Sequence, residues 1–229
     1  MSSPANWFST VPGATLWSAE QQMLDTILAR TEGYRGLQIG PLADSQSVIS
    51  GAAVRERIHL NSSEQTRRPW HGRISEGLPI SSDSIDLVVL RHCLSADTAG
   101  AELLQEIIRV LTDSGHLIIF TLNPISWLGL KGRRVEQVPR LYNFWLRREL
   151  GTTPMVEKAQ WSCGLGQLPG KATAASIRYP LSLVANTRII RYRKHVVTGN
   201  VARVSFKLRP KVGGRQIPAN PGLFRKTGT

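Results

Sequence analysis

Two stretches of the sequence decide the fold: IDLVVL, residues 85–90, and GAELLQEIIRVLTDSGHLIIFTL, residues 100–122. The first is a nearly continuous apolar run, typical of a strand that a parallel sheet buries on both faces. In the second, apolar side chains first recur at helical spacing, and the turn sequence DSG is then expected to end the helix. Residues 116–122 return to a continuous apolar run and predict another buried strand.

The N-terminal part of the chain repeats this alternation of helix and strand. Residues 16–31 predict a helix with one apolar face, and Glu20 is expected mostly outside that face. Residues 36–40 predict a short strand that ends in glycine, and residues 58–60 and 72–75 are further strand candidates. Helices that alternate with buried strands indicate an α/β fold with a doubly wound, mostly parallel sheet.

The second half has a weaker pattern. Residues 151–176 are rich in Gly, Thr, Ala and Pro and predict a loop. Residues 189–197 and 201–208 alternate apolar and basic side chains, which predicts a C-terminal antiparallel hairpin with one apolar face and one basic face. Residues 209–229 predict a basic, disordered tail.

Charge is distributed very unevenly along the 229 residues. Residues 1–122 carry nine Arg and 13 acids, whereas residues 123–229 carry 20 Lys and Arg against three acids. This asymmetry favours a polyanionic partner for the second half, such as nucleic acid, with residues 178–209 as the phosphate-contacting surface. The alternative is a basic surface that only water covers. The basic residues of that segment are Arg178, Arg188, Arg191, Arg193, Lys194, Arg203, Lys207 and Arg209.

Several classes of protein are excluded or disfavoured by composition. No apolar stretch reaches the roughly 18 residues that a transmembrane helix needs, and the first residues do not resemble a secretory signal. Cys93 and Cys163 are too few for a disulfide framework, and with the histidines they form no metal-binding spacing. A cytoplasmic protein without a bound metal is therefore expected.

A doubly wound sheet binds ligands beyond the carboxyl ends of its strands, where the strand order reverses. The candidate site residues are therefore those that follow the predicted strands: residues 40–44, 75–76, 91–93 and 123–124. Small residues after the first strand would let the backbone approach a ligand, and polar residues after the others would orient it.

Two blocks of sequence resemble the class I S-adenosylmethionine-dependent methyltransferases of the type-11 kind. EGLPISSDSIDLVV, residues 76–89, is similar to the family's E-x-LPF…SFDLV stretch, and LQEIIRVLTDSGHLII, residues 104–119, is similar to its L-x-E-x-x-R-V-L-x-x-G-G-x-L-x-I stretch. Residues 123–130 resemble an Asn-Pro-x-Ser segment of a bacterial subgroup. The resemblance is best over residues 16–130. It implies a Rossmann-like methyltransferase domain over residues 1–208, S-adenosylmethionine as cofactor and an unidentified methyl acceptor.

The sequence departs from the family where the cofactor is usually held. The family's first motif, [ED]-x-G-x-G-x-G, corresponds here to QIGPLAD, residues 38–44, and no acidic residue ends the second strand. Two hypotheses follow: the cofactor binds through backbone amides and unusual side chains, or the protein is an inactive, nucleic-acid-binding or regulatory module. Under the first, the resemblance implies these contacts: Gly40, Pro41, Asp44, Asn61, Ser75, Glu76, Leu78 and Arg91.

Few residues suggest themselves for catalysis. His92 is a candidate general base because an imidazole titrates near neutrality, although a histidine bonded to the backbone at a strand end is an equal alternative. Asn123 and Trp127 are candidate substrate contacts, with the alternative of a turn that stops the strand. The aromatic cluster Tyr142-Phe144-Trp145 either stacks on a substrate or belongs to the core.

Overall fold

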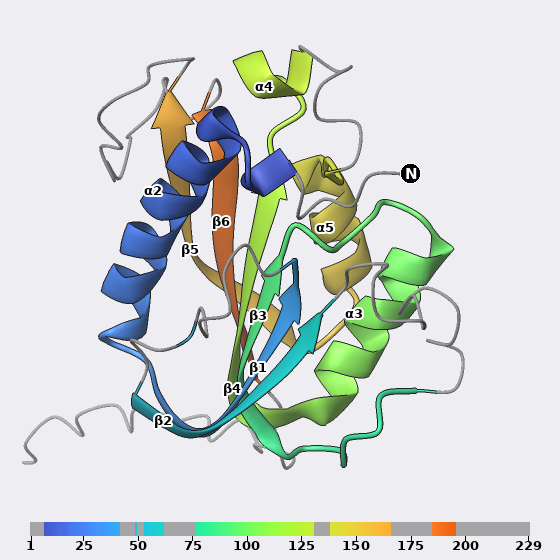
Figure 1. The fold of residues 1–229 in the computed structure, drawn as a ribbon. Helices are drawn as coiled ribbons and strands as arrows, with labels where there is room; N and C mark the ends of the chain where they lie inside the picture. The colour runs from blue at the N-terminus through green and yellow to red at the C-terminus, as the bar shows by residue number, and fades with distance from the viewer. Residues whose placement is uncertain are drawn as a thin grey trace, which may run out of the picture. The chain divides into compact units, whose positions relative to one another are not determined.

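The computed structural model describes residues 7–41, 49, 53–61, 77–130, 138–165 and 185–195. Six strands form one sheet in the order β2-β1-β3-β4-β6-β5 (Figure 1). Strands β1 to β4 pair in parallel, and β6 runs antiparallel to both β4 and β5. The elements are α2 (Val11–Leu28), β1 (Glu32–Gly40), β2 (Ala53–Asn61), β3 (Ile85–Arg91), α3 (Thr98–Val110), β4 (Leu111–Leu122), α4 (Trp127–Leu130), α5 (Asn143–Leu150), β5 (Met155–Leu165) and β6 (Ala185–Lys194).

The sheet is covered on both faces, as the continuous apolar run of β3 predicts. Leu87 and Val89 point into the layer that contains α2, whereas Val88 and Leu90 point into the layer that contains α3 and α5. All four side chains are completely buried, since neighbours in a strand face opposite sides. The predicted α/β architecture with a mostly parallel sheet is confirmed.

Helix α3 begins at a side-chain cap and ends earlier than expected. The Asp97 carboxylate accepts a hydrogen bond from Gly100 N at 2.8 Å. The helix stops at Val110, and β4 starts at Leu111, so the DSG sequence expected to end the helix lies inside the strand. Its first residues pair with β3 before a register shift, which the sequence pattern does not reveal.

A C-terminal antiparallel hairpin is present, but its strands are β5 and β6. The strand predicted from residue 189 is part of β6, whose partner is Met155–Leu165. The prediction of a loop was wrong for residues 155–165. β5 is an edge strand in which Val156, Lys158 and Gln160 are exposed, so its sequence has only a weak apolar pattern. Residues 201–208 and the expected tail, 209–229, lie outside the described residues.

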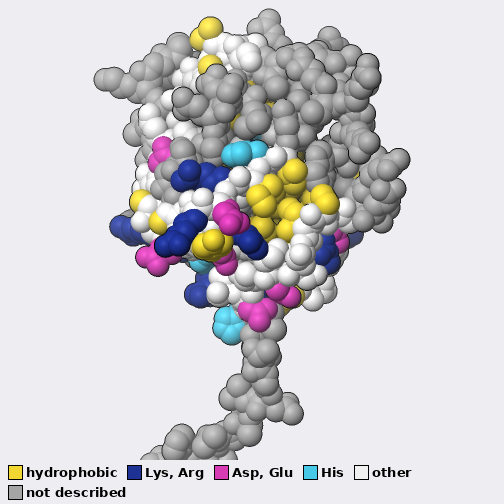
Figure 2. Space-filling view, turned by 60° about the horizontal axis from the view of Figure 1, so that its bottom comes forward, with side chains coloured by type: hydrophobic (Ala, Val, Ile, Leu, Met, Phe, Trp, Pro, Cys, Tyr) yellow, Lys and Arg dark blue, Asp and Glu magenta, His cyan; other side chains and the backbone are white. Residues whose placement is uncertain are grey.

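The end of the sheet at which the parallel strands begin carries charges of both signs. Figure 2 shows basic and acidic side chains interspersed on this side of the molecule. A recess of about 530 Å³ opens there, and its lining includes Arg30, Glu32, Asp86 and Arg193. Such a mixture gives no single-sign field for a polyanion.

None of the helices that the structure describes is long and apolar enough to cross a membrane.

Candidate active site

The carboxyl ends of β1 and β3 meet at Gly40 and Arg91. The pairing between the two strands extends as far as Ile39 and Leu90. The next residue of β1, Gly40, adopts a φ of 146°. A Cβ at Gly40 would overlap the carbonyl oxygen of Arg91. The glycine therefore does more than admit a ligand: it is needed for the two strand ends to come together.

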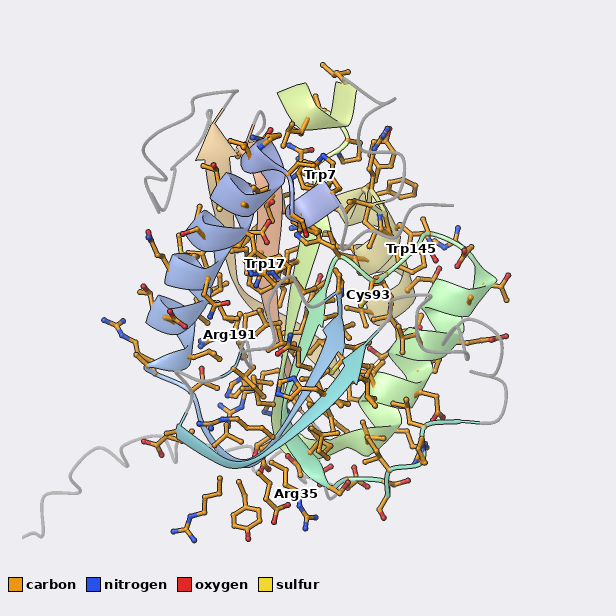
Figure 3. The ribbon with its side chains drawn as sticks, in the orientation of Figure 1. Trp7, Trp17, Arg35, Cys93, Trp145 and Arg191 are labelled. Atoms are coloured by element: carbon orange, nitrogen blue, oxygen red, sulfur yellow. The ribbon has the colours of Figure 1, made fainter. Side chains whose placement is uncertain are left out.

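The Arg91 side chain is buried and directed toward α2. Its Nε and Nη2 donate to Glu20 Oε2 at 3.1 and 2.9 Å, and Nη2 also donates to the Trp17 carbonyl at 2.9 Å. The guanidinium carbon lies 3.2 Å from the centroid of the Trp17 ring, which projects from α2 toward the sheet (Figure 3). Burial lowers the pKa of Arg91, and Glu20 opposes that effect. The Arg91 guanidinium is therefore occupied by partners inside the protein.

Glu20 is the centre of this buried cluster, and the sequence interpretation of it was wrong. It is completely buried, and its Oε1 accepts a hydrogen bond from Thr187 Oγ1 of β6 at 2.6 Å. Burial alone would raise the pKa of Glu20, but His92, Arg91 and Thr187 lower it to about 2. One signal was present in the sequence: Glu20 precedes Met23, Leu24 and Ile27 by the three, four and seven residues that define one helix face.

His92 is the second member of the cluster. Its Nε2 lies 2.9 Å from Glu20 Oε1, and its backbone N–H donates to the Phe120 carbonyl. Its φ of 48° is in the left-handed region, so the residue turns sharply after β3. The other ring nitrogen, Nδ1, is buried and has no hydrogen-bond partner within the part of the chain that the structure describes.

Aromatic residues cover the cluster. The Phe8 ring lies 5.0 Å from the His92 ring and 5.1 Å from the Trp17 ring, between centroids. Trp7 stacks edge-on against Phe8 and lies at the carboxyl end of the strands (Figure 3). Both are buried. Gly13 permits this cover, because a Cβ there would overlap the Trp7 carbonyl oxygen.

The two sequence blocks that resemble the methyltransferases bind each other. Glu106 Oε2 accepts a hydrogen bond from Leu78 N at 2.7 Å, and Arg109 donates to the carbonyls of Leu78 and Ile80 at 3.1 and 3.0 Å. A hydrogen bond from Arg109 lowers the pKa of Glu106. Glu106 and Arg109 of the second block thus fix the backbone of Leu78 and Ile80 in the first block.

Asn123 forms the turn that the sequence offered as an alternative. Its Nδ2 donates to the Ala185 carbonyl at 3.0 Å, and its Oδ1 accepts from Ile125 N at 3.3 Å.

Cys93, directly after His92, donates to the Ile39 carbonyl at 3.4 Å, and burial raises its pKa to about 12. A thiol with that pKa is not a thiolate nucleophile at neutral pH.

Among the remaining predicted contacts, the structure describes the side chain of Pro41 alone. Pro41 is buried directly after β1. Asn61 ends β2 and Trp127 begins α4, but their side chains are not described. Asp44, Ser75 and Glu76 lie outside the described residues.

The predicted phosphate-contacting surface is only partly exposed. Lys194 is buried and its Nζ donates to Asp83 Oδ1 at 2.7 Å and to the Leu111 carbonyl at 2.6 Å. Arg188 is buried as well, whereas Arg193 is exposed. The reason is that β6 lies inside the sheet and packs into a core layer on each face: Ile190 and Tyr192 belong to the layer of α3 and α5, and Ile189 to the layer of α2. Arg178, Arg203, Lys207 and Arg209 lie outside the described residues.

The comparisons with known proteins agree with the fold and motifs. Residues 42–119 match the family model described as a methyltransferase domain. This match confirms the resemblance to class I S-adenosylmethionine-dependent methyltransferases that the sequence blocks predict. A relative in Escherichia coli strain K12, the uncharacterized protein YafS, is 29% identical over 132 residues. That match covers 56% of this chain and 52% of YafS, so it spans about half of the relative's length.

Solved methyltransferases share the fold at low sequence identity. One from Thermotoga maritima, described as a possible histamine N-methyltransferase, is 15% identical with a TM-score of 0.54 over 82% of this chain and 93% of that chain. One from Archaeoglobus fulgidus is 15% identical with a TM-score of 0.52 over 76% and 94%. Geranyl diphosphate C-methyltransferase from Streptomyces coelicolor, solved with S-adenosylhomocysteine, is 12% identical with a TM-score of 0.51 over 78% and 81%.

Proposed function

We propose that the chain is a cytoplasmic S-adenosylmethionine-dependent methyltransferase in which His92, oriented by Glu20, is the general base. The observation that carries the proposal is the contact between His92 Nε2 and Glu20 Oε1 at the carboxyl end of β3, with Nδ1 left unpartnered among the described residues. In a doubly wound sheet that edge is where ligands bind.

The protonation states follow from the hydrogen bond. With a pKa of about 2, the Glu20 carboxylate is ionised at neutral pH and accepts hydrogen bonds only. His92 Nε2 therefore carries a proton, and in the neutral imidazole Nδ1 keeps its lone pair. Hydrolases of unrelated fold use the same arrangement, in which a buried carboxylate fixes the tautomer of a catalytic imidazole.

His92 would then take the proton from the acceptor. Bound S-adenosylmethionine would supply the methyl group on its positively charged sulfur. Nδ1 accepts the proton of an O–H or N–H acceptor, and Glu20 stabilises the imidazolium that results. Trp7 and Phe8 exclude water from the imidazole and the carboxylate, which strengthens the ionic contacts there.

The proposed cofactor contacts combine the strand ends with the motif residues. Gly40, Pro41 and the Arg91 backbone lie at the ends of β1 and β3. Leu78 follows the motif residues Ser75 and Glu76 in the sequence, and Glu106 fixes its backbone. An orphaned nitrogen at this edge, His92 Nδ1, is consistent with a ligand there. Asp44, Asn61, Ser75 and Glu76 remain proposed contacts from the motif.

Calorimetric titration with S-adenosylhomocysteine, at two temperatures so that a zero enthalpy does not hide binding, tests the cofactor. Binding near one equivalent is expected. No heat up to millimolar ligand would replace the proposal with the catalytically inactive regulatory module.

The base is tested separately by His92→Gln. The amide of this variant can still donate a hydrogen bond to Glu20, but it has no proton acceptor at the position of Nδ1. S-Adenosylhomocysteine should bind within about threefold of wild type, while transfer of labelled methyl from S-adenosylmethionine into cell extract falls about 100-fold or more. His116→Gln, at the opposite end of the sheet, is the matched control. Equal transfer by all three proteins would remove His92 from the mechanism.

A further inference from the structure

The recess at the amino ends of the parallel strands lies away from the candidate active site. It opens at the end of the sheet that Figure 2 brings forward, whereas Gly40 and His92 lie at the carboxyl ends of the strands. Its lining comes from the turn between α2 and β1, the beginning of β3, the first half of β4 and the end of β6. Its volume of about 530 Å³ is within the range of small-molecule sites.

The antiparallel direction of β6 brings a basic side chain to this recess. Arg193, near the end of β6, pairs with His116 of β4, so the two side chains lie on the same face of the sheet. Ile118 and Ile189 share that face and belong to the core layer of α2. Arg30 follows the end of α2 by two residues and lines the recess as well. Two guanidinium groups and one imidazole therefore border the same space.

The acids of the recess oppose a bound anion only weakly. The Asp86 carboxylate is already bonded: its Oδ2 accepts from the backbone N–H groups of Tyr34 and Arg35 at 2.7 and 3.0 Å. Its Oδ1 accepts a hydrogen bond from Thr112 Oγ1 at 3.2 Å. The other lining acid, Glu32, is exposed at the first position of β1, where water screens its charge.

The basic groups, in contrast, are not neutralised. Arg30 and Arg193 are exposed and form no ion pair with an acid in the described part of the chain. Burial lowers the pKa of His116, and the charges of Arg191 and Arg193 lower it further. Both charged groups that shift this pKa are basic, so the potential at the His116 ring is positive.

We propose that this recess binds the phosphate group of a small phosphate monoester, with Arg30 and Arg193 as its charged contacts. Two guanidinium groups match the double negative charge of a phosphate monoester, and each can donate two parallel hydrogen bonds to its oxygens. The neutral imidazole of His116 can donate one more. A monocarboxylate would leave one guanidinium without a counterion. A long polyanion would place further phosphates beside Glu32 and the other acids of this surface.

This site is independent of the proposed methyl transfer. The recess and His92 lie at opposite ends of the sheet, so the ligand of the recess is neither the cofactor nor the methyl acceptor. Phosphate binding and methyl transfer can therefore fail separately.

Calorimetric titration with glycerol phosphate tests the site, with glycerol as the uncharged control. Glycerol phosphate should bind near one equivalent in low salt, and glycerol should give no heat. Arg193→Gln should weaken the binding at least about tenfold, because it removes a charge-assisted contact. Arg148→Gln removes the same charge from α5, where the side chain is 73% exposed, and should bind as wild type.

Nuclear magnetic resonance locates the bound phosphate. A dianion beside the imidazole favours its protonated form, so saturating glycerol phosphate should raise the pKa of His116 by about 1. The resonance is assigned by its loss in His116→Gln. Saturating S-adenosylhomocysteine should leave this pKa unchanged.

Four outcomes would overturn the proposal. They are no binding of glycerol phosphate, equal binding by Arg193→Gln and Arg148→Gln, succinate binding as tight as that of glycerol phosphate, and displacement of glycerol phosphate by S-adenosylhomocysteine. Thermal unfolding of both variants excludes loss of fold as the cause. Binding of glycerol phosphate by a protein that gives no heat with S-adenosylhomocysteine would retain this site and retire the proposed function.

Discussion

Glu20 and His92 are 72 residues apart in sequence, yet the carboxylate of the first contacts the imidazole of the second at 2.9 Å in the buried interior. The same carboxylate accepts hydrogen bonds from Arg91 and Thr187. One acidic side chain on α2 thus fixes the end of β3 and the first residues of β6 together. Because these donors share one buried carboxylate, removing the charge of Glu20 should destabilise this edge of the sheet.

Glu20→Gln should destabilise the protein strongly. The neutral amide would leave Arg91 buried without its counterion, and breaking one side of a buried pair costs about 3–5 kcal/mol of unfolding free energy. Urea unfolding measures this loss. Glu102→Gln, at an exposed position of α3, is the control and should change stability by less than about 0.5 kcal/mol. A loss of similar size in both variants would show that the buried pair is not an important contributor.

Acid should remove the stabilisation that Glu20 provides. Its pKa in the folded state is about 2, below the ordinary value of 4.5, so the folded state favours the ionised form. The contribution is therefore complete above about pH 5.5 and declines as the pH falls from about 4.5 toward about 2. Between pH 6 and pH 3 the loss from this group is about 2 kcal/mol.

Urea unfolding across that range, for wild type and Glu20→Gln, isolates the effect of this carboxylate. The wild-type free energy of unfolding should fall by about 2 kcal/mol more than that of the variant. Parallel pH profiles would contradict the depressed pKa of Glu20.

The sequence predicts the sheet better than it predicts the site. The strands β3 and β4 are readable because both of their faces are buried, which makes their residues continuously apolar. β5 was missed because an edge strand with exposed Val156 and Lys158 has no such run. Pattern depends on burial, and burial at an edge is set by neighbours that are far away in sequence.

The candidate site depends on contacts of the same long range. His92 was identified from its place after a strand. Its partner Glu20 occupies a helix position that the local pattern predicts to lie outside the apolar face. Gly40 was identified as a place for a ligand, whereas the structure adds a contact with the Arg91 carbonyl. In both cases the residue type was visible and the neighbour was not, because tertiary packing brings the two together.

Gly40→Ala should disrupt the meeting of β1 and β3. An alanine would need a φ of 146° that its Cβ disfavours, and that Cβ would overlap Arg91. We expect a loss of about 2–4 kcal/mol in the free energy of unfolding.

Gly36→Ala in the same strand is the matched control, because its Cβ would meet the flexible end of the Ile49 side chain at 2.8 Å. It should cost about 1 kcal/mol or less. If the two variants unfold at the same urea concentration, the contact between Gly40 and Arg91 does not constrain the strand ends.

Both thiols should be unreactive in the folded protein. Cys93 and Cys163 are free and buried, and burial raises the pKa of each to about 12. At pH 8 the thiolate fraction is then about one in ten thousand, and a reagent has no access to the sulfur. Titration with a thiol-specific aromatic disulfide should detect neither cysteine in buffer and both in denaturing urea. Rapid reaction of Cys93 in buffer, compared with the Cys93→Ser variant, would instead make that residue an accessible nucleophile beside His92 and reopen the assignment of the base.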